Sequence, residues 1–279
     1  MGFGCNAAGI IGCRIIDSPR EKLISIITNA FVPCNGRFPF LITISTIFIG
    51  SFFAEGSSFL ATLCVLAIIL LGIFMTLLAS QFLSKTFLKG TPSSFVLELP
   101  PYRKPQFGKV LVRSILDRTL FVLARALTVA VPAGIFIWLL ANLTIVDQSL
   151  LTYVANFFDP FAQLLGLDGY IFTAFLLGMP ANEIVLPIIL MSYLQTGTLV
   201  NLEDTASIAS ILHANGWTLL TAINVMIFTL LHFPCATSLL TIYKETKSIR
   251  WTILSFCLPT ICGILLCLLT TGIAHIFWI

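Results

Sequence analysis

The stretch GMPANEIVLPIIL, residues 178–190, decides the fold, because it places polar groups and backbone breaks inside an apolar region. It holds two prolines, at Pro180 and Pro187, together with Asn182 and the carboxylate of Glu183. A proline inside a helix removes a backbone hydrogen bond, so one continuous helix is disfavoured here. An ionisable side chain at membrane depth is costly and by default marks a functional site.

The composition indicates a membrane protein. Apolar residues make up 58% of the 279 residues, charged residues 10%, and the mean hydropathy is +1.02. A soluble domain is about half apolar and about a quarter charged. A helix needs about 20 apolar residues to cross the hydrocarbon. Windows of adequate or nearly adequate length are 38–54, 59–83, 119–141, 217–240 and 252–279, whereas 170–195 is long enough but interrupted.

Several classes of function find no support in the sequence. No basic run with interleaved aromatic residues appears, so we expect no nucleic-acid partner. The sequence contains no HExxH, GxSxG or GxxxxGK(S/T) motif, so we expect that the chain itself is not an enzyme. Residues 1–13 are apolar but too short to cross a membrane, and they do not resemble a cleavable signal.

The basic residues are distributed unevenly among the polar connections. Fourteen of the fifteen lie in 14–37, 84–118 and 241–251, whereas 55–58, 142–169 and 196–216 contain acidic residues and no basic ones. Basic residues in short loops mark the cytoplasmic side of a membrane protein. We therefore expect 84–118 and 241–251 to face the cytoplasm and the acidic connections to face away from it.

This charge pattern predicts a re-entrant segment. The two connections that flank 170–195 both read as non-cytoplasmic, so the segment enters and returns on one side, with its break near Gly178 and Pro180. An ordinary proline-kinked span with a weak charge signal in one loop is the alternative. Non-helical backbone at membrane depth is tolerated where it is buried in protein or lines a cavity. A cavity is therefore expected at the break.

A weak internal repeat supports the same view. GFGCN at 2–6 parallels GMPAN at 178–182, and FVPC at 31–34 parallels HFPC at 232–235, in the same order. The expected helix breaks are at Gly4, Pro33, Gly178, Pro180 and Pro187. A basic loop follows the first motif and an acidic loop follows the second, as an inverted-topology repeat predicts.

The polar residues expected at membrane depth form a candidate transport path. Thiol, imidazole, amide and carboxylate groups suit a divalent first-row metal such as Fe²⁺ or Zn²⁺, whereas Na⁺ would be expected to use carbonyls and hydroxyls. For the histidine, an interfacial position at a helix end is the alternative. The candidates are Cys5, Asn6, Cys34, Asn182, Glu183, His232 and Cys235.

Long motifs in this chain resemble the membrane domain of FeoB, the bacterial ferrous-iron transporter family. They are GFGCNAAGIIGCRIIDSPREKLISIITNAFVPCNGRFP, GMPANEIVLPI and GWTLLTAINVMIFTLLHFPCATSLLTIYKETKSIRWT. The resemblance implies two "gate" repeats, with Cys5 and Cys34 on the iron path. Many members have Val-Pro where this chain has Ala7-Ala8, so the first break must depend on glycines.

The resemblance also implies parts that this sequence does not contain. The family carries an N-terminal GTP-binding domain, so GTP would act only through a missing domain or a partner chain. Met1 lies inside a motif, and we expect a C-terminal fragment, a truncated reading frame or a separately encoded half. The expected function is Fe²⁺ transport in the bacterial plasma (inner) membrane; the alternatives are a carrier of an organic solute such as a nucleoside, or a non-transporting membrane subunit.

The predicted fold is an all-α, polytopic transmembrane bundle with broken or re-entrant helices in two gate-like repeats. Its partners would be the lipid bilayer and Fe²⁺, and a homo-oligomer is left open. The first half spans 1–83, with segments 1–13, 20–34, 38–54 and 59–83; 84–118 is a cytoplasmic connection; and the second half spans 119–279, with the broken segment 170–195.

Overall fold

The computed structural model describes residues 2–50, 57–88, 108, 112, 121–145, 148–202 and 204–277, and most of these lie in helices. Of the expected polar connection 84–118, residues 84–86 are the last residues of helix α4 and residues 87–88 form a turn after it. The rest of this connection lies almost wholly outside the described residues. The first elements are α1 (Asn6–Gly12), η1 (Cys13–Ile15), α2 (Pro19–Thr28), η2 (Asn29–Phe31), α3 (Phe38–Phe48) and α4 (Ser57–Thr86).

The later part of the chain begins with α6 (Phe121–Asn142) and a short hairpin of β1 (Thr144–Ile145) and β2 (Gln148–Ser149), the only sheet among the described residues. It continues with α7 (Leu150–Leu164), α8 (Gly169–Leu177), η5 (Asn182–Ile184), α9 (Val185–Leu194), α10 (Thr205–Ala214), α11 (Leu219–Leu231), α12 (Ala236–Thr246) and α13 (Ile249–Phe277). The prediction of an all-α helical bundle is confirmed.

Three stretches of the described chain are long and apolar enough to cross a membrane: Ser58–Thr86, Leu219–Thr246 and Ile249–Phe277. Only 17% of the most apolar window of the first and 22% of that of the third are buried, whereas 72% is buried in the second. The outer faces of α4 and α13 therefore present apolar side chains to the surroundings, as lipid-facing helices do, while α11 lies at the centre.

The expected span 217–240 is interrupted. Helix α11 ends at Leu231, His232 is extended, and α12 begins only after Cys235. Pro234 has no backbone N–H with which to continue the helix, and its ring excludes the helical conformation from the preceding residue. The sequence predicted a break at this place. The window 217–240, which we counted as one span, nevertheless contains two helices, α11 and the start of α12.

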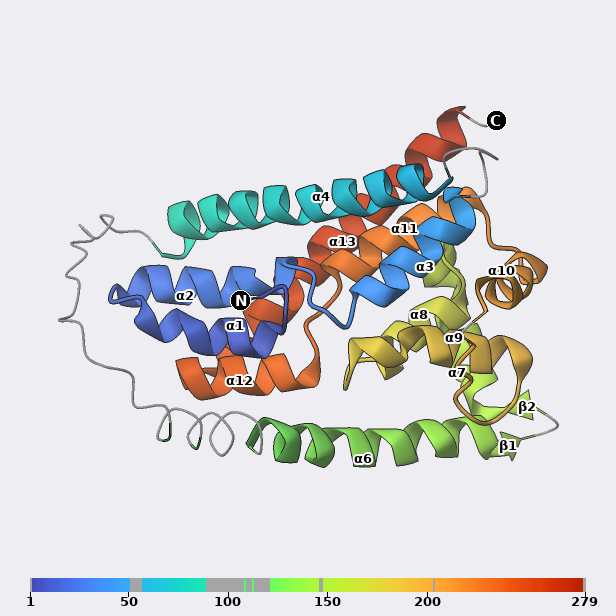
Figure 1. The fold of residues 1–279 in the computed structure, drawn as a ribbon, viewed down its shortest axis with the longest axis horizontal. Coiled ribbons are helices and arrows are strands. Elements are labelled where there is room, and N and C mark those ends of the chain that lie inside the picture. Colours follow the sequence, from blue (N-terminus) through green and yellow to red (C-terminus); the bar gives the residue numbers. More distant parts are fainter. Residues whose placement is uncertain are drawn as a thin grey trace.

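The segment predicted to be re-entrant is broken near Gly178, as expected, and a sharper bend, between α7 and α8, precedes it. Helix α7 and helix α8 meet at an angle of 110°. Figure 1 shows α8 running inward from the end of the molecule that holds α7 and the β1–β2 hairpin, and α9 returning toward the same end, where α10 lies. The chain between α8 and α9 turns at residues 178–181 inside the bundle.

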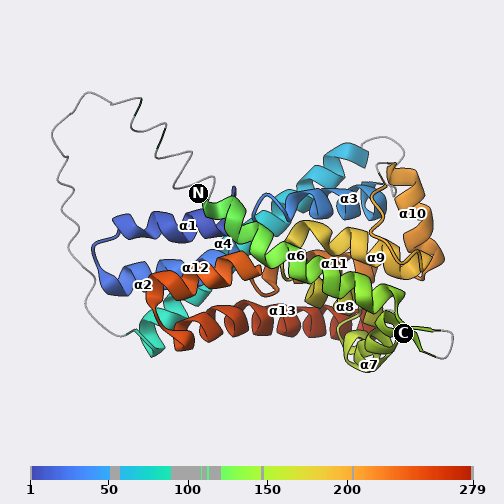
Figure 2. The same ribbon diagram turned by 90° about the horizontal axis from the view of Figure 1, so that it is seen from below.

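A second helical hairpin, α1 with α2, occupies the opposite end of the molecule. Figure 2 shows α1, α2 and α12 side by side there, and both α1 and α2 contact α12. Arg14 forms a salt bridge with Glu245, and Arg20 donates to the backbone carbonyl of Leu88 and to Ser84 at the end of α4. The α1–α2 connection, the end of α4 and the α12–α13 connection thus form one basic end of the bundle (Figure 1).

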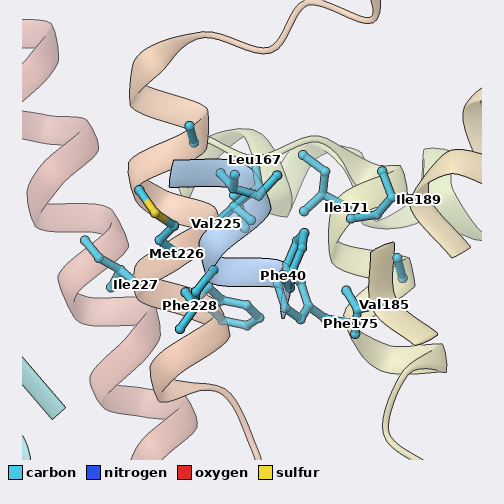
Figure 3. Packing of buried hydrophobic residues seen from close by; sticks show 14 of the residues in the cluster. Phe40, Leu167, Ile171, Phe175, Val185, Ile189, Val225, Met226, Ile227 and Phe228 are labelled. Carbon is cyan, nitrogen blue, oxygen red and sulfur yellow. The ribbon is translucent and has the colours of Figure 1, made fainter. Parts of the chain in front are cut away.

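The core lies between α3, α8, α9 and α11. Figure 3 shows Phe40, Phe175 and Phe228 packed together beside Val185, with ring centroids of Phe175 and Phe228 4.9 Å apart. The long helices α4 and α13 pack against this centre through glycines. A Cβ at Gly72 would lie 2.9 Å from the Phe31 carbonyl, and one at Gly263 would lie 3.2 Å from the Leu231 carbonyl. Each glycine therefore lets a long helix approach the backbone just before a Pro-Cys pair.

Candidate functional site

The two Gly-x-x-x-Asn motifs have the same backbone conformation. Cys5 has φ −152° and ψ 126°, and Ala181, at the equivalent position, has φ −151° and ψ 122°. The asparagine that follows each of them begins a helical element and is buried. Turns at residues 2–4 and 178–180 precede these extended residues, so the weak sequence repeat corresponds to a similar local structure in both halves.

Each motif is also hydrogen-bonded to the residue that follows the Pro-Cys pair of its own half. The Asn35 N–H donates to the Gly4 carbonyl at 3.2 Å, and the Ala236 N–H donates to the Met179 carbonyl at 2.8 Å. The accepting carbonyl belongs to the third residue of the motif in the first half and to the second residue in the second half. In both halves, therefore, a broken segment is held against a second break that lies far from it in sequence.

The two buried asparagines make different contacts. The Asn6 side-chain amide donates to the carbonyls of Gly2 and Val32, at 3.1 and 3.2 Å, and so closes the first break upon itself. The Asn182 amide nitrogen instead lies 3.7 Å from the Cys34 sulfur, and its oxygen lies 3.3 Å from His232 Nε2. Asn182 therefore links the break of the second half to the Pro-Cys pair of the first.

His232 lies beside this contact between Asn182 and Cys34. Its side chain is buried, and its Nδ1 lies 3.0 Å from the Phe228 carbonyl and 2.9 Å from the Thr229 carbonyl, so Nδ1 carries the proton and donates. The other ring nitrogen, Nε2, then carries no proton and faces Asn182 Oδ1, which is also an acceptor. The hydrogen bonds of Nδ1 therefore fix the ring beside Asn182, and the contact at Nε2 is close packing and not a hydrogen bond.

Glu183 lies at the boundary between the two halves. A Cβ on Gly36 would come within 2.9 Å of Glu183 Cγ and 3.1 Å of Oε1, so the carboxylate lies across this glycine of the first half. The side chain is exposed, and it lines a cavity of about 250 Å³ with oxygen-bearing Thr43 and Asn201. No hydrogen bond or ion pair between described residues involves this carboxylate, which leaves its oxygens directed to the cavity.

The thiols are less closely grouped than the sequence led us to expect. Cys5 is exposed, Cys34 and Cys235 are half-buried, and the Cys235 sulfur lies 3.2 Å from the Ser238 hydroxyl. Neither Cys5 nor Cys34 is a lining residue of the Glu183 cavity. Within the described ranges, no three His, Cys, Asp or Glu side chains form a group that could hold a metal ion.

The predicted helix breaks are placed correctly with one exception. Gly4, Pro33, Gly178 and Pro180 lie in the non-helical turns, and a Cβ at Gly178 would come within 2.5 Å of Val185. Pro187 does not break a helix, because it is in the first turn of α9, where its missing N–H would have no intrahelical partner.

Sequence reasoning missed Arg37. We counted it with the basic residues of an exposed loop, and this was wrong, because its side chain is fully buried at the start of α3. The charge count cannot distinguish a loop cation from one that turns inward. The signal that could have revealed it is its position three residues after Cys34, between a helix break and an apolar segment.

Comparison with known proteins identifies the chain. Residues 65–117 match the family described as Ferrous iron transport protein B C terminus, and residues 123–249 match the family described as Nucleoside recognition. Over 285 aligned residues the chain is 33% identical to the Fe(2+) transporter FeoB of Staphylococcus aureus (strain COL), an alignment that covers 99% of this chain. The chain belongs to the FeoB family.

Other FeoB proteins align over similar lengths. The Fe(2+) transporter FeoB of Methanocaldococcus jannaschii is 26% identical over 88% of the chain, and that of Synechocystis sp. is 26% identical over 94%. The chain spans 40% of the length of the S. aureus relative and 36% of the M. jannaschii relative. No solved structure matches this FeoB-family chain.

Replacing Asn182 with alanine is expected to destabilise the protein. The change removes the buried amide that lies between the Cys34 sulfur and the His232 ring, and the loss of such buried polar contacts typically costs about 0.5–3 kcal/mol. The melting temperature of the purified protein in detergent should therefore fall by several degrees. Asn201→Ala is the matched control, since Asn201 is exposed and such changes stay within about 0.5 kcal/mol. Equal melting temperatures for the two variants would show that the link does not stabilise the fold.

Proposed function

We propose that this chain is the membrane permease of a ferrous-iron uptake system. The curated relatives that it matches are named Fe(2+) transporters, and the chain aligns with them over nearly its whole length. The observation that carries the proposal is Glu183, a carboxylate at a broken re-entrant helix that faces a cavity between α3 and α9. A carboxylate in such a position is suited to attract a divalent cation.

The ligand chemistry along the break suits Fe²⁺. Glu183, Thr43 and Asn201 supply oxygen atoms at the cavity, and Cys34 supplies a sulfur outside its lining, in contact with Asn182. Fe²⁺ accepts both hard oxygen and soft thiolate ligands, whereas Mg²⁺ favours oxygen alone. We infer that an ion loses part of its hydration beside Glu183 and then passes the Asn182–Cys34 contact. GTP would act on this path only through a domain or chain outside these residues.

We infer further that the chain has two gate-like halves of opposite orientation. In support, α3 packs on α4 as α12 packs on α13, and each long helix also contacts the helix before the other half's break, α4 with α11 and α13 with α2. Substrate sites in inverted-repeat transporters lie where the broken elements meet. The contact between Asn182 and Cys34 is such a meeting point.

A second candidate is transport of an organic solute such as a nucleoside. It is favoured by the match of residues 123–249 to the family described as Nucleoside recognition. A nucleoside carrier would bind an uncharged solute, so uptake would not depend on a carboxylate. The response of uptake to the charge at position 183 therefore separates the two candidates.

Glu183→Gln is expected to reduce Fe²⁺ uptake at least roughly tenfold, because losing about 1.4 kcal/mol of ion binding is a factor of ten. Glutamine keeps the volume of the side chain and removes its charge. Uptake of radioactive Fe²⁺ would be measured in cells that express the protein with its native flanking sequence, with membrane abundance checked by immunoblot. Glu183→Asp should retain part of the activity. Unchanged uptake in the glutamine variant, or saturable uptake of uridine, would count against the proposal.

Cys34→Ser is expected to weaken Fe²⁺ uptake while protein abundance stays normal, because a hydroxyl is a poorer ligand than a thiolate for this ion. Cys262→Ser is the matched control, since Cys262 is also half-buried but lies on α13 and packs against the apolar core. If both variants lose uptake equally, the thiol of Cys34 has no special role in the path.

The orientation in the membrane follows from the basic end. We propose that it faces the cytoplasm, as short basic loops do. A cysteine at exposed Arg250 should then react with an impermeant maleimide only in opened cells, and a cysteine at exposed Ser210 on α10 should react in intact cells, each above the background of the unsubstituted protein. The reverse pattern would invert the topology.

A further inference from the structure

Arg37 carries a positive charge into the centre of the bundle. It is the largest of the side chains that are fully buried, with a relative exposure of 0%. Removing a charge from water costs several kcal/mol unless it is paired and hydrogen-bonded. The one salt bridge between described residues is that of Arg14 with Glu245, so no described carboxylate pairs with Arg37. Its compensation must come from elsewhere.

Four backbone carbonyls provide this compensation. The Arg37 Nη1 donates to Ala30 at 3.3 Å and to Leu230 at 2.8 Å. The Nη2 donates to His232 and Phe233, each at 3.3 Å. Ala30 lies in η2, which ends the first broken segment; Leu230 lies in the last turn of α11, and His232 and Phe233 follow the end of that helix. One guanidinium therefore binds the terminal carbonyls of both breaks.

These carbonyls form the kind of group that binds a cation. The last carbonyls of a helix have no intrahelical partner and form the negative end of the helix dipole. In transporters built from broken helices, unwound carbonyls and half-helix C-termini coordinate the coupling Na⁺ or H⁺. In this chain the corresponding place is taken by a cation that is covalently part of the protein.

The two halves differ at this position. Counting three residues from each Pro-Cys pair, Arg37 in the first half corresponds to Ser238 in the second. Ser238 is also fully buried, but its hydroxyl lies 3.2 Å from the Cys235 sulfur of its own half. Only the first half supplies a cation, and this cation binds the carbonyls of both.

We propose that Arg37 is a built-in cation that replaces a coupling sodium ion, so that neither the stability nor the transport of this chain depends on Na⁺. The statement about transport rests on the proposed function, whereas the statement about stability concerns the folded protein alone. The proposal makes Arg37 a positioning residue that holds the two breaks together.

The test uses the purified full-length protein in detergent and follows its melting temperature in NaCl, KCl and choline chloride at equal ionic strength. The native protein should melt at the same temperature in all three. Arg37→Ala should melt lower by on the order of 10 °C, because an emptied buried charge site leaves four carbonyls unpaired. Millimolar guanidinium or Na⁺ should then raise the melting temperature of this variant and not that of the native protein.

The matched control is Arg20→Ala, which removes a half-buried arginine that also donates to a backbone carbonyl, but at the basic end. Neither guanidinium nor Na⁺ should rescue it. If Arg37→Ala does not fold, Arg37→Lys and Arg37→Met replace it, and the lysine variant should melt higher. Two results would overturn the proposal: a native protein that melts higher in Na⁺ than in choline, or a methionine variant as stable as the lysine variant.

The outcome can be separated from that of the transport proposal. The melting experiments contain no iron, so their result stands even if the protein does not take up Fe²⁺. Fe²⁺ uptake by cells is then compared in Na⁺ medium and choline medium. Equal uptake agrees with a built-in cation, whereas uptake that requires Na⁺ would overturn the inference and leave transport itself intact.

Discussion

A broken helix inside an apolar bundle exposes backbone carbonyls and N–H groups where no water can satisfy them, and the arrangement of this protein depends on how they are satisfied. Unsatisfied backbone groups cost several kcal/mol each in hydrocarbon, so irregular backbone must find partners within the protein. The structure uses Asn35 and Ala236 to bind the two Gly-x-x-x-Asn turns, and Arg37 to bind the ends of η2 and α11. Gly72 and Gly263 allow the long helices to cover these sites closely.

The same requirement explains why the two halves are similar in backbone and different in side chains. Cys5 and Ala181 need only the same extended conformation, which many residues can adopt, so the local structure is repeated although the residues differ. The polar contacts need particular atoms. Asn6 closes on its own half, whereas Asn182 reaches across to Cys34, and the contact between the halves is therefore asymmetric.

Much of the fold could be predicted from the sequence, because it depends on local features of the chain: apolar windows, charges in the connections, glycines and prolines. Glycine and proline predicted the turn between α8 and α9 and marked four of the five predicted breaks. The re-entrant path that the distribution of basic residues predicts stays a prediction. The mistake at Pro187 has a simple cause: a proline in the first turn of a helix leaves it intact, and only the start of α9 shows that it lies there.

The arrangement of the candidate site could not be predicted in the same way. The sequence placed Asn182, Cys34 and His232 on one list, but it could not show that Nδ1 of His232 is held by the carbonyls of its own helix end. Nor could it show that Arg37 turns inward, since the decisive carbonyls belong to α11, about 195 residues further along the chain. Contacts of this kind depend on how distant segments pack, and a periodic pattern carries no information about them.

The charges around the break have a consequence for any cation that enters the cavity. Glu183 packs against Gly36, and the next residue along the chain is Arg37, whose side chain is buried. If the chain carries a divalent ion as proposed, the exposed carboxylate would attract the ion, and the buried guanidinium would repel it from the carbonyls that Arg37 binds. Conduction requires a site that binds strongly enough to admit the ion and weakly enough to release it. In the proposed path the carboxylate would serve the first requirement, and the fixed positive charge of Arg37 would serve the second.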